Sequence, residues 1–131
     1  MGEGYTVRCT ACGWSRDDLL TGGGWVRWDL DNVLDAVGLP WRGEVRALLR
    51  EGRVLATGVR RTLHRCPHCW DLSSHLVVDL ALKGGGSFHT RFHCTRCGTE
   101  LVPVLLKEIK RGPCPACGRK ALTCEMSMLW D

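Results

Sequence analysis

Four Cys-x-x-Cys pairs constrain this 131-residue chain more than any other feature of its sequence. Two thiols separated by two residues can face one ion through a tight turn, and two such pairs complete a tetrahedral four-sulfur site. The N-terminal residues lack the basic and apolar regions of a secretory signal, so disulfides are not favoured. The sequence therefore predicts reduced thiols, two metal sites and a cytoplasmic location. In chain order the pairs are Cys9/Cys12, Cys66/Cys69, Cys94/Cys97 and Cys114/Cys117.

The spacing leaves two ways of assigning the four pairs to two sites. The favoured assignment is sequential, because the sixteen residues between the third and fourth pairs are typical of a zinc ribbon. The alternative is nested: a hairpin around the glycines at 84–86 would bring the second pair to the third, and the first pair would join the fourth. In the sequential assignment, site 1 contains Cys9, Cys12, Cys66 and Cys69, and site 2 contains Cys94, Cys97, Cys114 and Cys117.

The ligand set indicates what the metal does. Four thiolates complete a tetrahedral shell and leave no position for water or substrate, which is typical of structural zinc. We therefore expect two Zn²⁺ per chain, with iron less favoured, and a protein that is not an enzyme. Gly13, Gly98 and Gly118 follow three of the pairs and suit a left-handed turn, a role we do not expect of Trp70 after the second pair. Cys124, outside the pairs, is expected to be a small apolar core residue.

The residues between the cysteines predict a small, mainly β fold. Short apolar runs separated by glycine-rich turns favour β-hairpins, including a strand over residues 99–106 followed by a connection at 107–112. Apolar residues at helical spacing predict helices at 29–38 and 41–52, forming an α-helical hairpin inserted at about 29–52. We accordingly expect two zinc ribbons: an N-terminal one, 1–86, containing the helical insertion, and a C-terminal one, 87–131.

These cysteine turns carry a resemblance to known proteins. Residues 94–118, CTRCGTELVPVLLKEIKRGPCPACG, look like a zinc ribbon of the rubredoxin-like kind. The segments YTVRCTACGW and CPACG also resemble the two iron-binding knuckles of rubredoxin, and the whole chain is similar to uncharacterised bacterial proteins with tandem zinc ribbons. The resemblance implies a fold and a metal. Trp70 and the long insertion after Cys12 depart from rubredoxin, so iron-based electron transfer is the alternative function.

The charge pattern supplies the only hint of a partner. Eight thiolates and two Zn²⁺ ions bring the formal net charge of +4 close to zero, so only local patches argue for nucleic acid. Arginines at four-residue spacing in the second predicted helix could contact phosphates, or could instead pair with the acidic residues of the first helix. We expect an adaptor or regulatory module for a protein or a nucleic acid, with no membrane and no small-molecule substrate. The candidate phosphate contacts are Arg42, Arg46, Arg50 and Arg53.

Overall fold

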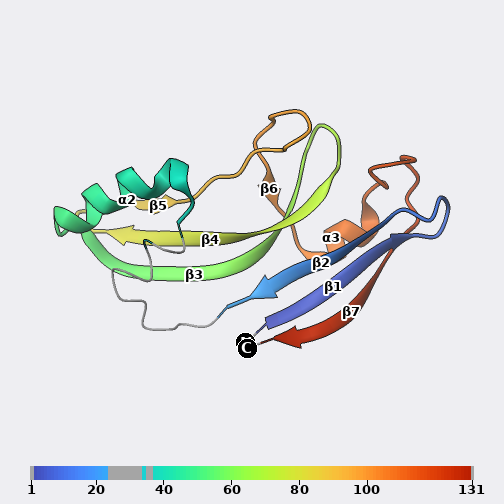
Figure 1. The fold of residues 1–131 in the computed structure, drawn as a ribbon, viewed down its shortest axis with the longest axis horizontal. Helices are drawn as coiled ribbons and strands as arrows, with labels where there is room; N and C mark the ends of the chain where they lie inside the picture. Colours follow the sequence, from blue (N-terminus) through green and yellow to red (C-terminus); the bar gives the residue numbers. More distant parts are fainter. Residues whose placement is uncertain (1, 24–33, 35–36, 131) are drawn as a thin grey trace. The chain divides into compact units, whose positions relative to one another are not determined.

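The computed structural model describes residues 2–23, 34 and 37–130 and is mainly antiparallel β, as predicted (Figure 1). The two helices among these residues are α2 (Leu39–Arg50) and α3 (Leu106–Arg111). The strands are β1 (Gly2–Cys9), β2 (Ser15–Gly22), β3 (Val54–Arg65), β4 (Leu72–Leu82), β5 (Ser87–His89), β6 (Val102–Pro103) and β7 (Leu122–Trp130).

The chain forms two compact units, each built from separate stretches of sequence. Unit 1 comprises 1–22, 61–75 and 92–131, and unit 2 comprises 23–60 and 76–91. The predicted division after residue 86 is wrong, because it would separate β4 from β5, which pair at Leu80 and Phe88. Strands β3 and β4 are long enough to contribute to both units, a continuity that short apolar runs did not reveal.

Unit 1 is built around the pairing of the first and last strands. Strand β1 pairs antiparallel with β2 and, on its other side, with β7 from Gly2↔Trp130 to Cys9↔Leu122. The short β6 pairs with β3. Buried side chains from β1, β2, β3, β4, α3 and β7 form the main core of this unit, and two cage cysteines are part of it. The members of this core are Val7, Cys9, Leu19, Leu63, Leu72, Val104, Ile109, Cys114 and Leu122.

Unit 2 contains α2, residues 54–60 of β3 and residues 76–82 of β4. The helix has Pro40 in its first turn and is followed by Gly52 at φ +64°, residues that are typical of a helix start and a helix stop. Its fully buried Val45 packs with Val59 of β3 and Val78 of β4. The helix predicted at 41–52 is therefore confirmed. Most of its expected hairpin partner, 29–38, lies outside the described residues.

The segment between the third and fourth cysteine pairs differs from the prediction. The strand expected at 99–106 is reduced to β6, and the expected connection at 107–112 contains α3. The helix forms because Ile109 can enter the core of unit 1, where it is 1% exposed. One buried residue in a six-residue helix is too little periodicity to detect in the sequence.

Candidate metal centres

All four cysteine pairs adopt the same hydrogen-bonded turn. In each, the carbonyl of the first cysteine accepts a hydrogen bond from the N–H four residues later, and its own N–H donates to the carbonyl five residues later. For the first pair these N···O distances are 3.0 Å from Gly13 to Cys9 and 2.7 Å from Cys9 to Trp14. The turn thus satisfies the backbone locally and leaves both sulfurs on its inner side.

The fourth residue after each first cysteine takes a left-handed backbone conformation. The φ angle is +79° at Gly13, +75° at Gly98 and +75° at Gly118. Trp70 has φ +66°, so the expectation that it would not fill the glycine role was wrong. The guanidinium of Arg65 lies 4.8 Å from the centre of the indole ring, a contact that offsets part of the cost of the left-handed tryptophan.

The four pairs gather into two clusters in a nested arrangement. In each cluster the four Sγ atoms lie within 4.8 Å of one another, and in the described chain each cluster contains cysteines alone. The sequential assignment is therefore wrong, and the nested alternative is the one that the fold adopts. The terminal cage consists of Cys9, Cys12, Cys114 and Cys117, and the central cage of Cys66, Cys69, Cys94 and Cys97.

Strand register explains why the fold adopts the nested arrangement and not the sequential one that local spacing favoured. The β1–β7 ladder ends at Cys9↔Leu122, and the N–H of Thr10 donates to the carbonyl of Ala121 at 2.9 Å, which places the first and fourth turns together. The third turn reaches the second because β6 pairs with the end of β3 at Arg65↔Val102. The sixteen-residue spacer therefore carries the chain from the central cage through β6 and α3 to the terminal cage.

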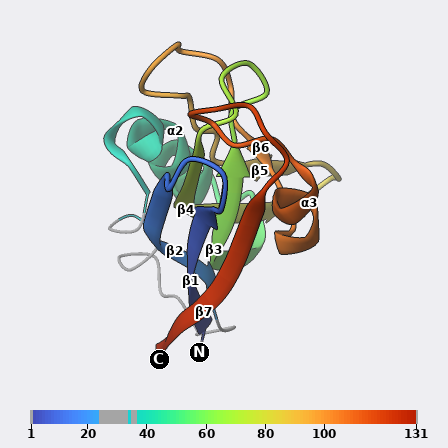
Figure 2. The ribbon, with the colours of Figure 1, turned by 90° about the vertical axis from the view of Figure 1, so that its right-hand side faces the viewer.

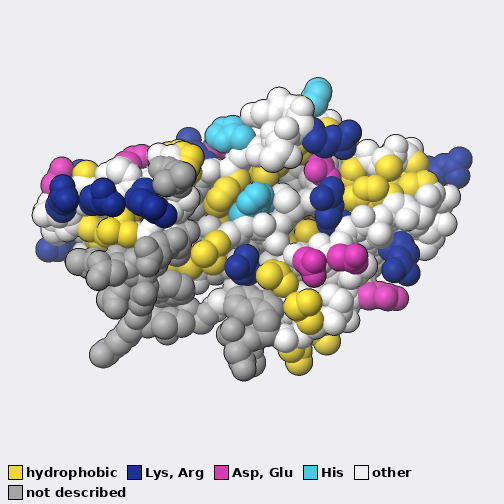
Figure 3. Space-filling view, in the orientation of Figure 1, with side chains coloured by type: hydrophobic (Ala, Val, Ile, Leu, Met, Phe, Trp, Pro, Cys, Tyr) yellow, Lys and Arg dark blue, Asp and Glu magenta, His cyan; other side chains and the backbone are white. Residues whose placement is uncertain are grey.

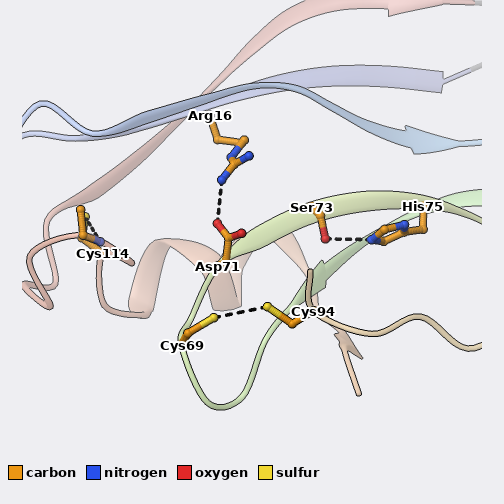
Figure 4. Close-up of polar contacts among 8 residues, drawn as sticks. Arg16, Cys69, Asp71, Ser73, His75, Cys94 and Cys114 are labelled. Carbon is orange, nitrogen blue, oxygen red and sulfur yellow. Dashed lines mark hydrogen bonds and ion pairs between the residues drawn. The ribbon is translucent and has the colours of Figure 1, made fainter. Parts of the chain in front are cut away.

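The sulfur separations match a tetrahedral metal–thiolate centre. In the terminal cage Cys9–Cys117 and Cys12–Cys114 are each 3.7 Å apart. In the central cage Cys66–Cys97 is 3.4 Å and Cys69–Cys94 is 3.5 Å, the latter drawn in Figure 4. A Zn–S bond of about 2.3 Å implies S···S distances of about 3.8 Å in a regular tetrahedron, whereas a disulfide needs about 2.05 Å. Both cages fit a thiolate-bound metal, and all nine cysteines are free of disulfides.

Burial is asymmetric within both cages. The first cysteine of every pair is buried, and Cys66 is fully so. The second cysteine of the pair is exposed at Cys12, Cys97 and Cys117 and half-buried at Cys69. Each centre therefore has one side set into the protein interior and one side at the surface of unit 1.

Metal binding at these cages must displace protons. The hydroxyl and N–H of Thr99 lower the pKa of Cys97 to about 6. At Cys69 the N–H of Asp71 acts to lower the pKa, but burial and hydrogen bonds to Cys66 and Cys94 outweigh it and raise the pKa to about 12. A metal ion bound in either cage would therefore displace the protons that these thiols share.

A partly buried ion pair connects the segments that follow the first and second cysteine turns of unit 1. Arg16 follows the first cysteine turn and places its Nη2 atom 2.7 Å from Oδ1 of Asp71, which follows the second turn (Figure 4). The Asp71 side chain is 17% exposed, and its backbone carbonyl accepts from the N–H of Cys66. The pair thus links the strand that follows the first turn to the residue that closes the second turn.

The histidines take no part in the cages. His64 is buried, with Nδ1 2.9 Å from the carbonyl of Thr62, and His75 stacks on Phe92 with ring centroids 4.4 Å apart. Burial lowers the pKa of both imidazoles, and at His75 the charge of His64 adds to the effect. Cys124 packs against the core of unit 1, as expected of a small apolar residue.

The arginines proposed as phosphate contacts have unequal environments. Arg42 is half-buried and places Nη2 3.4 Å from the carbonyl oxygen of Val37, whereas Arg46 and Arg50 are exposed. Figure 3 shows basic side chains gathered over α2. Arg53 lies 3.7 Å from Glu51. The acidic residues of the first predicted helix, which could pair with this row, lie outside the described residues. Three of the four arginines, Arg46, Arg50 and Arg53, are therefore exposed, and their contact with phosphates stays a prediction.

No known protein family, curated protein or solved structure matches this chain significantly. Among the described helices, none combines the length and apolar character needed to cross a membrane. Any functional conclusion therefore depends on the geometry of the two cysteine cages.

Proposed function

We propose that the protein binds two structural zinc ions and acts as a non-enzymatic adaptor or regulatory module. The observation that carries this proposal is the composition of the cages: four convergent cysteine sulfurs in each, at separations suited to one tetrahedral ion. Such a shell is complete, so it supports a fold and offers no position for a substrate.

The packing around the cages explains why metal would be needed. Cys9 and Cys114 are members of the main core of unit 1, and Cys66 and Cys94 form a second cluster with Leu101. Half of the cage ligands therefore stand where larger apolar side chains would stand in a metal-free core. A structural zinc contributes about 10–16 kcal/mol of apparent binding energy, comparable with the net stability of a small domain.

Metal analysis of the natively purified protein tests the proposal. We expect a colourless protein with two zinc ions per chain that unfolds when a strong chelator removes them. A protein that keeps its circular dichroism spectrum after complete removal of metal would contradict a structural role. Because a binding surface depends on the fold, protein that has lost its spectrum on removal of metal should also have lost partner binding.

A rubredoxin-like iron protein is the second candidate. The terminal cage favours it, because that cage joins the two segments that resemble rubredoxin knuckles and leaves Cys12 and Cys117 exposed. This candidate requires red protein with iron in the terminal cage and a reversible one-electron potential. Zinc in both cages of native protein excludes it.

The exposed arginines of α2 support a nucleic acid as the partner. Arg46 and Arg50 lie one helical turn apart, and Glu44 lies on another side of the helix. If they contact phosphates, Arg46→Ala with Arg50→Ala should weaken binding to oligonucleotides and reduce its salt dependence by up to about two ions. Arg60→Ala is the matched control, because Arg60 is 63% exposed but lies 3.4 Å from Asp79. Equal binding of oligonucleotides by both variants would exclude phosphate contacts by these arginines and leave a protein as the partner.

A further inference from the structure

Helix α3 and the cysteine turn that follows it carry an excess of basic side chains. Residues 106–120 contain five basic residues and only one acidic residue, Glu108. The Glu108 carboxylate accepts a hydrogen bond from the N–H of Leu105 at 3.4 Å and so serves the start of the helix. All five basic residues are exposed, and we call them the basic face: Lys107, Lys110, Arg111, Arg119 and Lys120.

The basic face lacks counter-charges within the part of the chain that the structure describes. None of its five side chains forms an ion pair with a described residue, whereas Arg16, Arg53 and Arg60 lie 2.7, 3.7 and 3.4 Å from carboxylate oxygens. The five charges also outnumber that of Glu108 and the negative excess that four thiolates leave on one Zn²⁺ in the terminal cage. A surface with unpaired positive charge is suited to a polyanion.

The fold joins the basic residues into one surface of unit 1. In Figure 2, α3 lies beside β7, and the chain passes from α3 through the fourth cysteine turn into β7. Lys107 and Arg111 stand two residues before and after the buried Ile109, so they lie on the side of α3 away from the core. The N–H of Cys114 donates to the carbonyl of Arg119 at 2.8 Å, so the turn brings Arg119 back to the segment that follows α3.

An accessible aromatic ring lies at the end of α3. The Arg65 guanidinium is 4.8 Å from the centre of the Trp70 indole, and its Nη1 atom is 3.3 Å from the carbonyl oxygen of Glu108. A Cβ atom on Gly112 would lie 2.6 Å from the same Nη1 atom, so the guanidinium fills the space beside the bare backbone that follows α3. Trp70 itself is 37% exposed. The basic face is therefore bordered by an arginine and an accessible indole.

We propose that the basic face and Trp70 together bind a single-stranded nucleic acid. Phosphates of the strand contact the basic side chains, and one base stacks on the accessible surface of the indole. A single strand fits better than a duplex, because only unpaired bases leave their faces free to stack on an aromatic ring. It also fits better than an acidic peptide, which supplies negative charge without bases. The proposal rests on the binding function proposed above and gives it a partner class and a surface in unit 1, separate from α2.

Fluorescence anisotropy of the zinc-loaded protein with a labelled, mixed-sequence oligonucleotide of about 12 nucleotides tests the proposal. Affinity should fall as the salt concentration rises. Lys107→Gln/Arg111→Gln should make the slope of log K against log salt concentration shallower by about 1.4, since each phosphate contact to a single strand contributes about 0.7. Arg60→Gln/Lys83→Gln is the matched control, because it removes the same charge from two exposed residues of unit 2 and should leave the slope unchanged.

Substitutions of Trp70 test the stacking contact separately from charge. Trp70→Leu should weaken binding about tenfold, because base–aromatic stacking is lost, and Trp70→Phe should stay within about threefold of the wild type. Both variants are compared at wild-type zinc content and circular dichroism. Equal binding by Trp70→Leu and Trp70→Phe would overturn the proposal. Should Trp70→Leu fail to retain zinc, the salt slope of Lys107→Gln/Arg111→Gln decides the outcome.

Three further results would overturn the proposal. An unchanged salt slope in Lys107→Gln/Arg111→Gln would exclude phosphate contacts at α3, and weakening by Arg46→Ala/Arg50→Ala alone would assign the nucleic acid to α2. Equal binding of a duplex or of poly-glutamate would show attraction by charge without stacking. Absence of oligonucleotide binding would also overturn it, but would leave the structural zinc and a protein partner in place, since removal of metal tests those independently.

Discussion

Trp70 provides the sharpest test of how the cysteine turns are built. It occupies a position with φ +66° that the other three turns fill with glycine. A left-handed conformation costs a residue with a Cβ about 1–2 kcal/mol, whereas glycine loses about 0.5–1 kcal/mol more backbone entropy on folding. Glycine should therefore be better than alanine at position 70 by about 0.5–1 kcal/mol.

Burial of the indole stabilises the folded state and therefore favours tryptophan over both glycine and alanine at position 70. The side chain is 37% exposed, so roughly 150 Å² is covered, which at about 25 cal/mol per Å² gives an upper estimate near 4 kcal/mol. The contact with Arg65 adds about 0.5–1 kcal/mol. We expect Trp70→Ala to lose about 2–4 kcal/mol of unfolding free energy and Trp70→Gly about 1 kcal/mol less, so the order of stability is Trp, Gly, Ala.

Urea unfolding of zinc-loaded protein, followed by circular dichroism at fixed zinc concentration, measures this order. Gly98→Ala is the matched control in the same cage, because a Cβ there would meet nothing within 4 Å and the change tests backbone strain alone. It should lose about 0.5–1 kcal/mol, the same amount that separates the two Trp70 variants. If Trp70→Ala is as stable as Trp70→Gly, the strain argument is refuted.

Two further predictions concern contacts around the cages. A double-mutant cycle on Arg16→Ala and Asp71→Asn should give a coupling energy of about 0.5–1 kcal/mol, because the side chains are 43% and 17% exposed and Asp71 is largely screened from water. Zero coupling would show that the ion pair does not stabilise the fold. Burial lowers the pKa values of His64 and His75, so both imidazoles bind a proton less readily in the folded than in the unfolded protein. The stability that is present above about pH 6.5 is therefore lost as the pH falls. NMR titration of the zinc-loaded protein should place both midpoints below 6.5, and a midpoint above that value would reverse the sign.

Local features of the fold were predictable from the sequence. The Cys-x-x-Cys spacing defines a turn within a few residues, so all four turns could be identified. The helix at 41–52 was predictable because Val45, Leu48 and Leu49 lie at helical spacing, and the structure packs them against one cluster. Cys124 alternates with apolar neighbours in a strand, which was enough to place it against the core.

Features that depend on long-range pairing were not predictable. Which turns share an ion is decided by the β1–β7 ladder, whose partners are more than 110 residues apart. Local spacing favoured the sequential assignment because it contains no information on that register. The left-handed Trp70 was missed for a related reason: the turn imposes its backbone conformation even where the residue type opposes it.

The zinc content of paired serine variants distinguishes the nested assignment of the cysteines from the sequential one. Cys12 and Cys117 belong to the terminal cage, whereas Cys69 belongs to the central cage. The double variant Cys12→Ser/Cys117→Ser should therefore retain one zinc per chain, and Cys12→Ser/Cys69→Ser should retain none that withstands a competing chelator. The opposite result, no zinc in the first variant and one in the second, would show that the cysteines are assigned sequentially.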